Sequence, residues 1–171
     1  MFLLGCRGFT LISLEWFDDP YTSAAFAVIV STILQSALFA FLHIYSPGST
    51  MISLLNLFIG GIAATMNVLV GGGSIWLGIG WHFGWNIFMG HILGRSTSGI
   101  PMSCAVVSII PQPALSEYHG GTFGPEQGIL APLAYVLGMV MIIQIYGWED
   151  FGLWIERLIV DDSSNMIGVT C

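Results

Sequence analysis

The stretch from residue 21 to residue 94 contains no Asp, Glu, Lys or Arg. A soluble domain cannot be covered by such a run, because water-facing positions need many charged side chains. Over the whole chain, charged residues make up 8% and hydrophobic residues 55%, whereas roughly 25% of the residues in soluble chains are charged. The sequence therefore predicts an integral, multi-pass membrane protein whose surroundings are the lipid bilayer.

Charge and cysteine content exclude other classes of protein. A formal net charge of −7 with only three cations, all of them arginine, gives no electrostatic footprint for nucleic acid. The three cysteines are far apart and form no CxxC motif, so they indicate neither a zinc ribbon nor a disulfide framework. We therefore expect no nucleic-acid partner.

Four apolar segments come near the roughly 20 residues that a helix needs to cross a bilayer. Their hydrophobic residues run continuously and do not alternate with period two, which favours helices over barrel strands. The predicted fold is thus all-α: a transmembrane helical bundle of about four spans plus a partial N-terminal helix within residues 1–17. The four predicted spans cover residues 23–45, 51–70, 74–94 and 128–147.

The remaining segments have a different composition. Residues 96–127 are rich in Gly, Pro and Ser, and we expect a long loop with a re-entrant or interfacial element at the apolar run 104–110. Residues 151–160 are expected to form an interfacial helix followed by a polar end. We therefore divide the chain into a membrane core, 1–147, and a tail of interfacial helix and polar residues, 148–171.

Polar side chains inside the predicted spans are the candidates for chemistry, because polar groups in a bilayer usually face a cavity or the bundle interior. His82 and Asn86 are four residues apart, so both project from one helix face and can act on one small molecule. His43 lies four residues after Phe39 in the first span. We expect His43, His82 and Asn86 to converge on one cavity, with Phe39 in its wall.

Each of these residues also has a purely structural interpretation. His43 could reach interfacial water, and Asn86 could be an interhelical hydrogen-bonding group. His91 points away from the His82 face and is expected at the interface, and His119 is expected to be a solvated loop histidine. The pair Gly80 and Gly84 forms a GxxxG motif, which would let another helix approach closely.

Several intramembrane protease sites are excluded by the motifs that are missing. The sequence has no HExxH motif, no GxSxG motif and no Asp within a predicted span. What remains is a water-activating arrangement in which His and Asn donate hydrogen bonds to the developing oxyanion. Such an arrangement normally needs a carboxylate as base, and the predicted spans contain none; Glu126 is assigned to the loop.

Phe39-x-x-x-His43 and His82-x-x-x-Asn86 resemble the second and third motifs of the CPBP intramembrane proteases. This family comprises the CAAX prenyl proteases and the bacteriocin-processing or immunity proteins, also called Abi. The flanking sequences SALFAFLH, GSIWLGIGWHFGWN and HGGTFGPEQGILAPL are also similar to the family. The resemblance extends over residues 3–138.

The first motif of the family, Glu-Glu-x-x-x-Arg, is matched only at its end. Arg7 and Gly8 fit, but Phe2 and Leu3 occupy the two glutamate positions. We therefore expect an N-terminally truncated member that starts inside this motif. The resemblance implies an intramembrane endopeptidase in which a glutamate, missing here, activates water. His43, His82 and Asn86 would assist, with Phe39 and Arg7 in support.

The resemblance also implies a peptide or protein substrate, and it raises the question of a divalent metal such as zinc. His43 and His82 would be the candidate ligands, although two histidines leave a catalytic zinc site incomplete. Two alternatives remain open at this point. One is an inactive membrane protein of the same fold that acts as a binding or immunity factor; the other is a small transporter element that uses its histidines to relay protons.

Overall fold

The structure is a computed structural model that describes residues 16–147, 152–153, 156 and 159. Arg7 lies outside the described residues, as do nearly all of the partial N-terminal helix and most of the interfacial helix expected at 151–160. Within the described part, every regular element is helical, and the only strand-like pairing is an isolated bridge between Thr97 and Ile100. The prediction of an all-α fold is confirmed for these residues.

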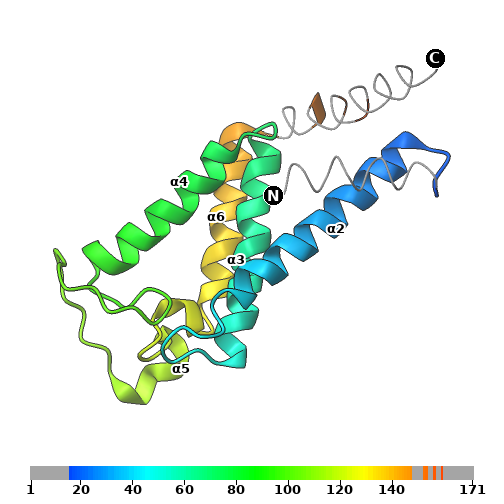
Figure 1. Ribbon diagram of the computed structural model, residues 1–171. Helices are drawn as coiled ribbons and strands as arrows, with labels where there is room; N and C mark the ends of the chain where they lie inside the picture. The colour runs from blue at the N-terminus through cyan, green and yellow to red at the C-terminus, as the bar shows by residue number, and fades with distance from the viewer. Residues whose placement is uncertain (1–15, 148–151, 154–155, 157–158, 160–171) are drawn as a thin grey trace.

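Four longer helices make up the body of the molecule (Figure 1). The helix α3 lies at the centre and packs against each of the other three. The helix α4 continues without a break into a π-helix, η1, of six residues. The elements are α2 (Pro20–Phe41), α3 (Met51–Val70), α4 (Ile75–Asn86), η1 (Ile87–Ile92) and α6 (Ala131–Tyr146).

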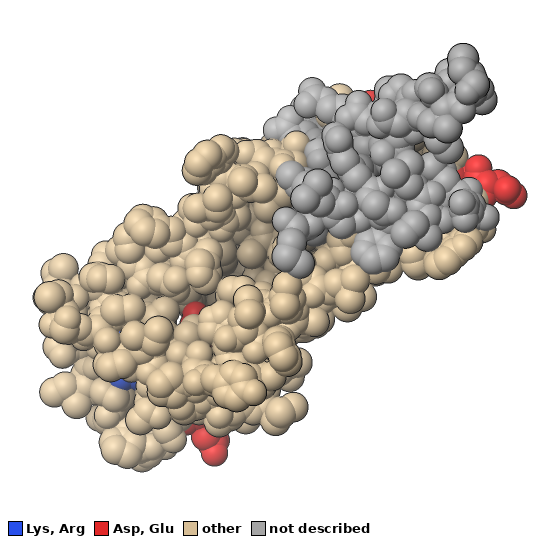
Figure 2. Space-filling model, in the orientation of Figure 1, with Lys and Arg blue, Asp and Glu red and all other residues tan. Residues whose placement is uncertain are grey.

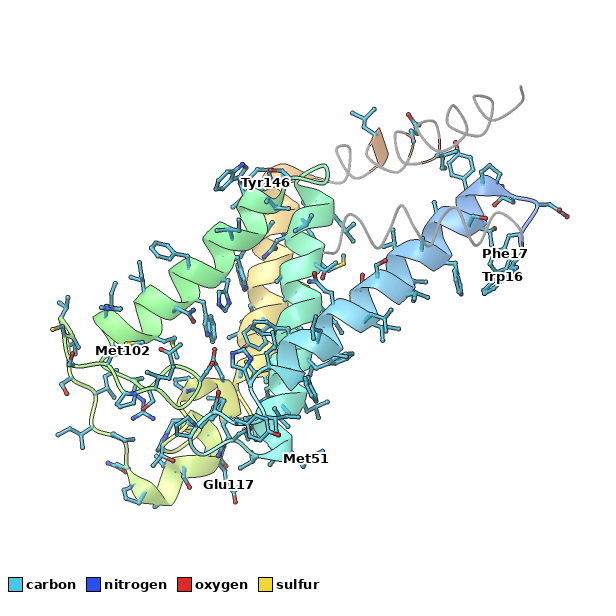
Figure 3. The ribbon with its side chains drawn as sticks, in the orientation of Figure 1. Trp16, Phe17, Met51, Met102, Glu117 and Tyr146 are labelled. Carbon is cyan, nitrogen blue, oxygen red and sulfur yellow. The ribbon has the colours of Figure 1, made fainter. Side chains whose placement is uncertain are left out.

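The long segment between η1 and α6 is gathered at one end of the molecule. It holds three short helices: η2 (Pro113–Leu115), α5 (Ser116–His119) and η3 (Pro125–Gln127). Figure 3 shows Met51 and Glu117 at this end and Tyr146 at the opposite end of α6. The apolar run 104–110 forms no helix and is irregular and exposed. We call the end that carries this segment the loop end.

Local sequence signals explain where the helices begin and end. The Asp19 carboxylate caps α2 by accepting from the Thr22 amide at 2.7 Å, and Pro20 occupies the first turn. A capping box between Thr50 and Ser53 starts α3, which has the predicted bounds. Two of the predicted spans differ from the observed helices: α2 begins three residues earlier than predicted and ends at Phe41, ahead of the turns 42–48, and α6 is shorter, beginning at Ala131.

The interior is built from small and polar residues, whereas many large apolar side chains are exposed. Ser36, Ser53 and Thr65 are fully buried, while Leu42 is 70% exposed. By length and composition, α2 and α3 could each cross a membrane, and α6 is a shorter apolar helix of 16 residues. Small residues inside and large apolar residues outside are typical of helices that pack within lipid.

Close helix packing uses other glycines than the predicted pair. No atom of the described residues lies within 4 Å of a Cβ built on Gly80 or Gly84, so the expected role of this GxxxG motif is wrong for the described structure. A Cβ on Gly78 would instead meet Ala64 and Val68 of α3. A GxxxG pair permits another helix to approach but does not require it. Here α4 packs against α3 through Gly78, two positions before the pair.

Candidate functional site

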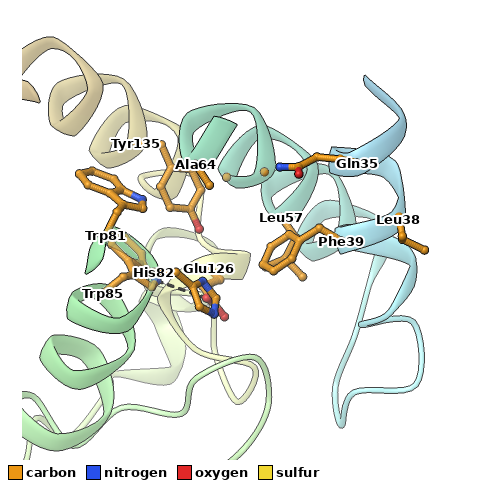
Figure 4. A pocket seen from close by; sticks show the side chains of 12 residues that line it. Gln35, Leu38, Phe39, Leu57, Ala64, Trp81, His82, Trp85, Glu126 and Tyr135 are labelled. Atoms are coloured by element: carbon orange, nitrogen blue, oxygen red, sulfur yellow. Dashed lines mark hydrogen bonds between the residues drawn. The ribbon is translucent and has the colours of Figure 1, made fainter. Parts of the chain in front are cut away.

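A cavity of about 240 Å³ lies where α2, α3, α4 and α6 face one another (Figure 4). Its wall is mostly apolar, and four polar or titratable side chains reach it: Gln35, His82, Glu126 and Tyr135. The Gln35 amide Nε2 donates to Thr65 Oγ1 at 2.8 Å and so links α2 to α3. The remaining lining residues are Leu38, Phe39, Leu57, Gly60, Gly61, Ala64, Trp81 and Trp85.

His82 and Asn86 form a hydrogen-bonded pair on one face of α4, as their spacing predicts. Asn86 Nδ2 lies 3.1 Å from His82 Nε2. If the amide donates, Nε2 is the acceptor and the imidazole proton is on Nδ1. Asn86 Oδ1 is buried and has no hydrogen-bond partner in the described part of the chain. The pair therefore carries both an imidazole and an uncommitted amide oxygen.

Asn86 is also the last α-helical residue before the π-helix η1. A π-helix changes the phase of the side chains that follow it, and such segments often occur at functional sites. His91, within η1, is exposed and does not line the cavity. The change of helix type thus falls directly after the His82–Asn86 pair.

Phe39 connects His43 to His82. The centroid of its ring lies 4.9 Å from that of His43 and 5.6 Å from that of His82, the latter in an edge-on arrangement. His43 lies in the turn just after α2, where its Nδ1 donates to the Phe39 carbonyl at 2.7 Å. Phe39 and His82 line the cavity itself, whereas His43 and Asn86 each contact one of these two residues.

Glu126 belongs to this site although the sequence pattern assigned it to a loop. It is 3% exposed and lines the same cavity as His82. Its Oε1 accepts from Trp85 Nε1 at 3.2 Å, and its Oε2 accepts from both the amide and the hydroxyl of Ser98, each at 2.7 Å. Asn56 of α3 holds the backbone beside it by donating to the carbonyls of Glu126 and Gly128.

Two sequence features could have drawn attention to Glu126. It is the single acid in the Gly- and Pro-rich stretch HGGTFGPEQGILAPL, and this stretch leads directly into an apolar segment. Gly124 within it has φ +110°, and a Cβ there would collide with the Ser96 carbonyl. Only glycine fits such a position, which indicates that the stretch is tightly folded against the protein.

The described residues do not fit a catalytic zinc site. They include no group of three or more His, Cys, Asp or Glu side chains that could hold a metal ion. Of the two candidate ligands, His82 directs Nε2 toward Asn86 and His43 uses Nδ1 for a carbonyl. Catalytic zinc usually has three protein ligands, and the described residues offer only these two candidates.

Comparison with known proteins finds a family model that resembles part of the chain. The family model "Type II CAAX prenyl endopeptidase Rce1-like" matches residues 4–88, a region that includes Phe39, His43, His82 and Asn86. Neither the curated proteins nor the solved structures contain a significant match to the chain. The match confirms the resemblance to the CPBP proteases: residues 4–88 belong to the Rce1-like family of type II CAAX prenyl endopeptidases.

Proposed function

We propose that the protein is an intramembrane endopeptidase of the CAAX type, which hydrolyses a peptide bond in the cavity between α2, α3, α4 and α6. The observation that carries the proposal is the His82–Asn86 pair, set at the edge of an apolar cavity and lying in the region matched by the family model. In this proposal α2, α3, α4 with η1, and α6 are the four spans, and residues 1–147 form the protease core.

The polar groups would act on a water molecule and on the carbonyl of the scissile bond. His82 holds the water, and the second Nδ2 hydrogen of Asn86 donates to the oxygen that becomes negative when water adds to the carbonyl. His43, held against Phe39, assists from the end of α2. The amine that leaves takes up the proton that the water gives to a base.

The proposal requires a carboxylate that accepts this proton, and no residue of the chain is an obvious candidate. Phe2 and Leu3 stand where the family resemblance places glutamates. Glu126 has most of its acceptor capacity committed to Trp85 and Ser98. We therefore assign Glu126 as a positioning residue, which fixes Trp85 and with it the helix face that carries His82. We expect slow turnover from the unmodified chain.

Phe2 and Leu3 also favour a second candidate function. A member of the family without the two glutamates would bind an apolar peptide in the cavity without cleaving it, as a binding or immunity factor. The two functions differ in one observable, the formation of product from a bound peptide.

Cleavage of a prenylated CAAX reporter peptide by the full chain in liposomes tests the site. We compare His82→Ala and Asn86→Ala with a matched control, His91→Ala, because His91 is on the same continuous helix but away from the cavity. In the chain carrying Phe2→Glu and Leu3→Glu, the first two variants should each lose about 10²-fold or more in turnover, and the control should lose little. Equal turnover of the reporter peptide by all three variants would refute the assignment of His82 and Asn86 to the active site.

A further inference from the structure

Arg95 is the only Lys or Arg among the residues that the structure describes, and it is buried. Its side chain is 7% exposed, and it follows the end of η1 at the loop end of the molecule. In Figure 2, Lys and Arg appear only as a small blue patch among uncharged residues. A buried guanidinium normally has a carboxylate partner, because removing an unpaired charge from water is costly.

No such partner is present in the described part of the chain. Arg95 Nη2 donates to the Gly121 carbonyl at 3.0 Å and to the carbonyl of His119 at 3.4 Å. Its third contact is His119 Nδ1, also at 3.4 Å. These contacts satisfy one nitrogen of the guanidinium, and no described residue bonds to the N–H groups of Nε and Nη1.

His119 does not supply negative charge and is not the solvated loop histidine that was expected. Its Nδ1 accepts from the Gly121 amide at 3.2 Å, and its Nε2 donates to the Gln112 carbonyl at 2.8 Å. Because Nδ1 accepts and Nε2 donates, the geometry corresponds to a neutral ring. Burial lowers the pKa of the Arg95 guanidinium. Arg95 nevertheless stays charged.

Arg95 also lines a second, more open cavity of about 680 Å³. Its lining includes three residues that carry hydroxyl groups, Ser96, Ser116 and Thr122, together with Arg95, His119 and several prolines. A cation among hydroxyl donors, without a carboxylate, suits a phosphate group, because guanidinium and hydroxyl groups are typical donors to phosphate oxygens.

The surroundings of this cavity favour a phosphate that is attached to a lipid. The exposed run 104–110 is held against the end of η1, since the Val106 amide donates to the His91 carbonyl at 2.8 Å. Val106 is 83% exposed and Ile110 is 86% exposed, and Pro111 lines the cavity. Apolar side chains at a helix end that also carries a buried cation match the boundary between headgroups and acyl chains.

We propose that this cavity binds the phosphate of a phospholipid headgroup through Arg95, with the apolar run 104–110 resting among the acyl chains. The site is separate from the peptidase cavity, so the proposal does not depend on proteolytic activity. The bound phosphate would also be an anionic partner for the buried guanidinium of Arg95, which contacts no carboxylate among the described residues.

The test measures binding of phosphatidylglycerol to the full chain, purified in a detergent without phosphate, by native mass spectrometry. Diacylglycerol with the same acyl chains lacks the phosphate, and inorganic phosphate lacks the lipid. We expect phosphatidylglycerol to bind at least about tenfold more tightly than either probe, in line with one to two charge-assisted hydrogen bonds. If diacylglycerol binds as tightly as phosphatidylglycerol, the proposal is overturned. If inorganic phosphate binds as tightly as phosphatidylglycerol, the cavity binds free phosphate, and the assignment to a lipid headgroup is overturned.

Two pairs of variants assign the binding to Arg95. Arg95→Gln should reduce binding to the level of diacylglycerol, whereas Arg157→Gln removes the same charge elsewhere in the chain and should not. If Arg95→Gln does not fold, Ser116→Asp decides, because it places a competing carboxylate in the cavity at an exposed helix start. Its control is Ser103→Asp, an exposed loop position that does not line this cavity. Unchanged binding in folded Arg95→Gln or in Ser116→Asp would refute the site.

Discussion

Trp85 Nε1 donates a hydrogen bond of 3.2 Å to Glu126 Oε1 and thereby joins the last turn of α4 to a residue 41 positions later. Trp85 lies one helical turn from His82, on the side that faces the cavity. Its ring also packs against Tyr135 of α6, with centroids 5.0 Å apart. This contact is the link by which the loop end can set the orientation of the proposed site.

We predict that the Trp85–Glu126 contact contributes measurably to stability. A buried hydrogen bond to a charged group contributes about 1.5–3 kcal/mol, so Trp85→Phe and Glu126→Gln should each destabilise the protein by about this amount. Unfolding in mixed micelles should give a coupling energy of about 0.5–3 kcal/mol in the double-mutant cycle. Glu117→Gln, at an exposed position, is the control. Strict additivity of the two changes would contradict the link.

Positioning can be separated from stability by the kinetics. If Glu126 acts through Trp85, Glu126→Gln and Trp85→Phe should lower kcat of the chain with Phe2→Glu and Leu3→Glu by similar factors and leave KM nearly unchanged, and the double variant should lose no more than either alone. A loss confined to Glu126→Gln would instead assign the carboxylate a direct part in the reaction.

Gly138 is predicted to be sensitive to the addition of a single methyl group. A Cβ at this position would collide with the Trp81 ring, which lines the cavity. Gly138→Ala should therefore destabilise the protein by about 1–3 kcal/mol, the usual cost of overpacking. Gly80→Ala is the matched control, because it lies in an apolar helix with open space around it and should be neutral or stabilising. Equal melting temperatures of the two variants would contradict the packing.

The start of α2 is predicted to loosen in acid. Hydrogen bonds from the Thr22 hydroxyl and amide lower the pKa of the Asp19 carboxyl in the folded protein. The cap is therefore fully formed above the ordinary pKa of Asp, about 3.9, and is lost as the pH falls through the lowered value. Amide exchange at Thr22, corrected for intrinsic rates, should accelerate over this range. Asp19→Asn should remove the pH dependence; a persistent acid step in that variant would assign it to another group.

The two ends of the continuous helix formed by α4 and η1 are predicted to lie on opposite sides of the bilayer. Cys104 is exposed at the loop end, whereas Ser74 lies in the turn between α3 and α4, at the other end of α4. In a chain with Cys6→Ser and Cys171→Ser, an impermeant maleimide should label Cys104 from one side only. With Cys104→Ser added, Ser74→Cys should label only from the other side. Labelling of both positions from the same side would rule out α4 and η1 as a span.

The sequence allowed local features to be predicted, because their causes are local. The bounds of α3 follow from the Thr50 cap and the glycines after Val70, and the His82–Asn86 pair follows from helical spacing. The roles of Glu126 and Arg95 could not be predicted in this way. Both depend on a long segment that folds back onto distant helices; Asn56, for example, holds carbonyls 70 and 72 positions away. The GxxxG pair was misassigned because small residues allow contact without requiring it.

The proposed peptidase site is tested most directly by the turnover of a prenylated CAAX reporter by four forms of the full chain in liposomes. These are the unmodified chain and the chain with Phe2→Glu and Leu3→Glu, each with and without His82→Ala. We expect trace cleavage by the unmodified chain and about 10²–10⁴-fold faster cleavage once the two glutamates are present, which is the usual contribution of a general base. His82→Ala should abolish this gain. Equally fast cleavage with and without the glutamates would contradict the assignment of the base, and a fast enzyme that tolerates His82→Ala would contradict the site itself.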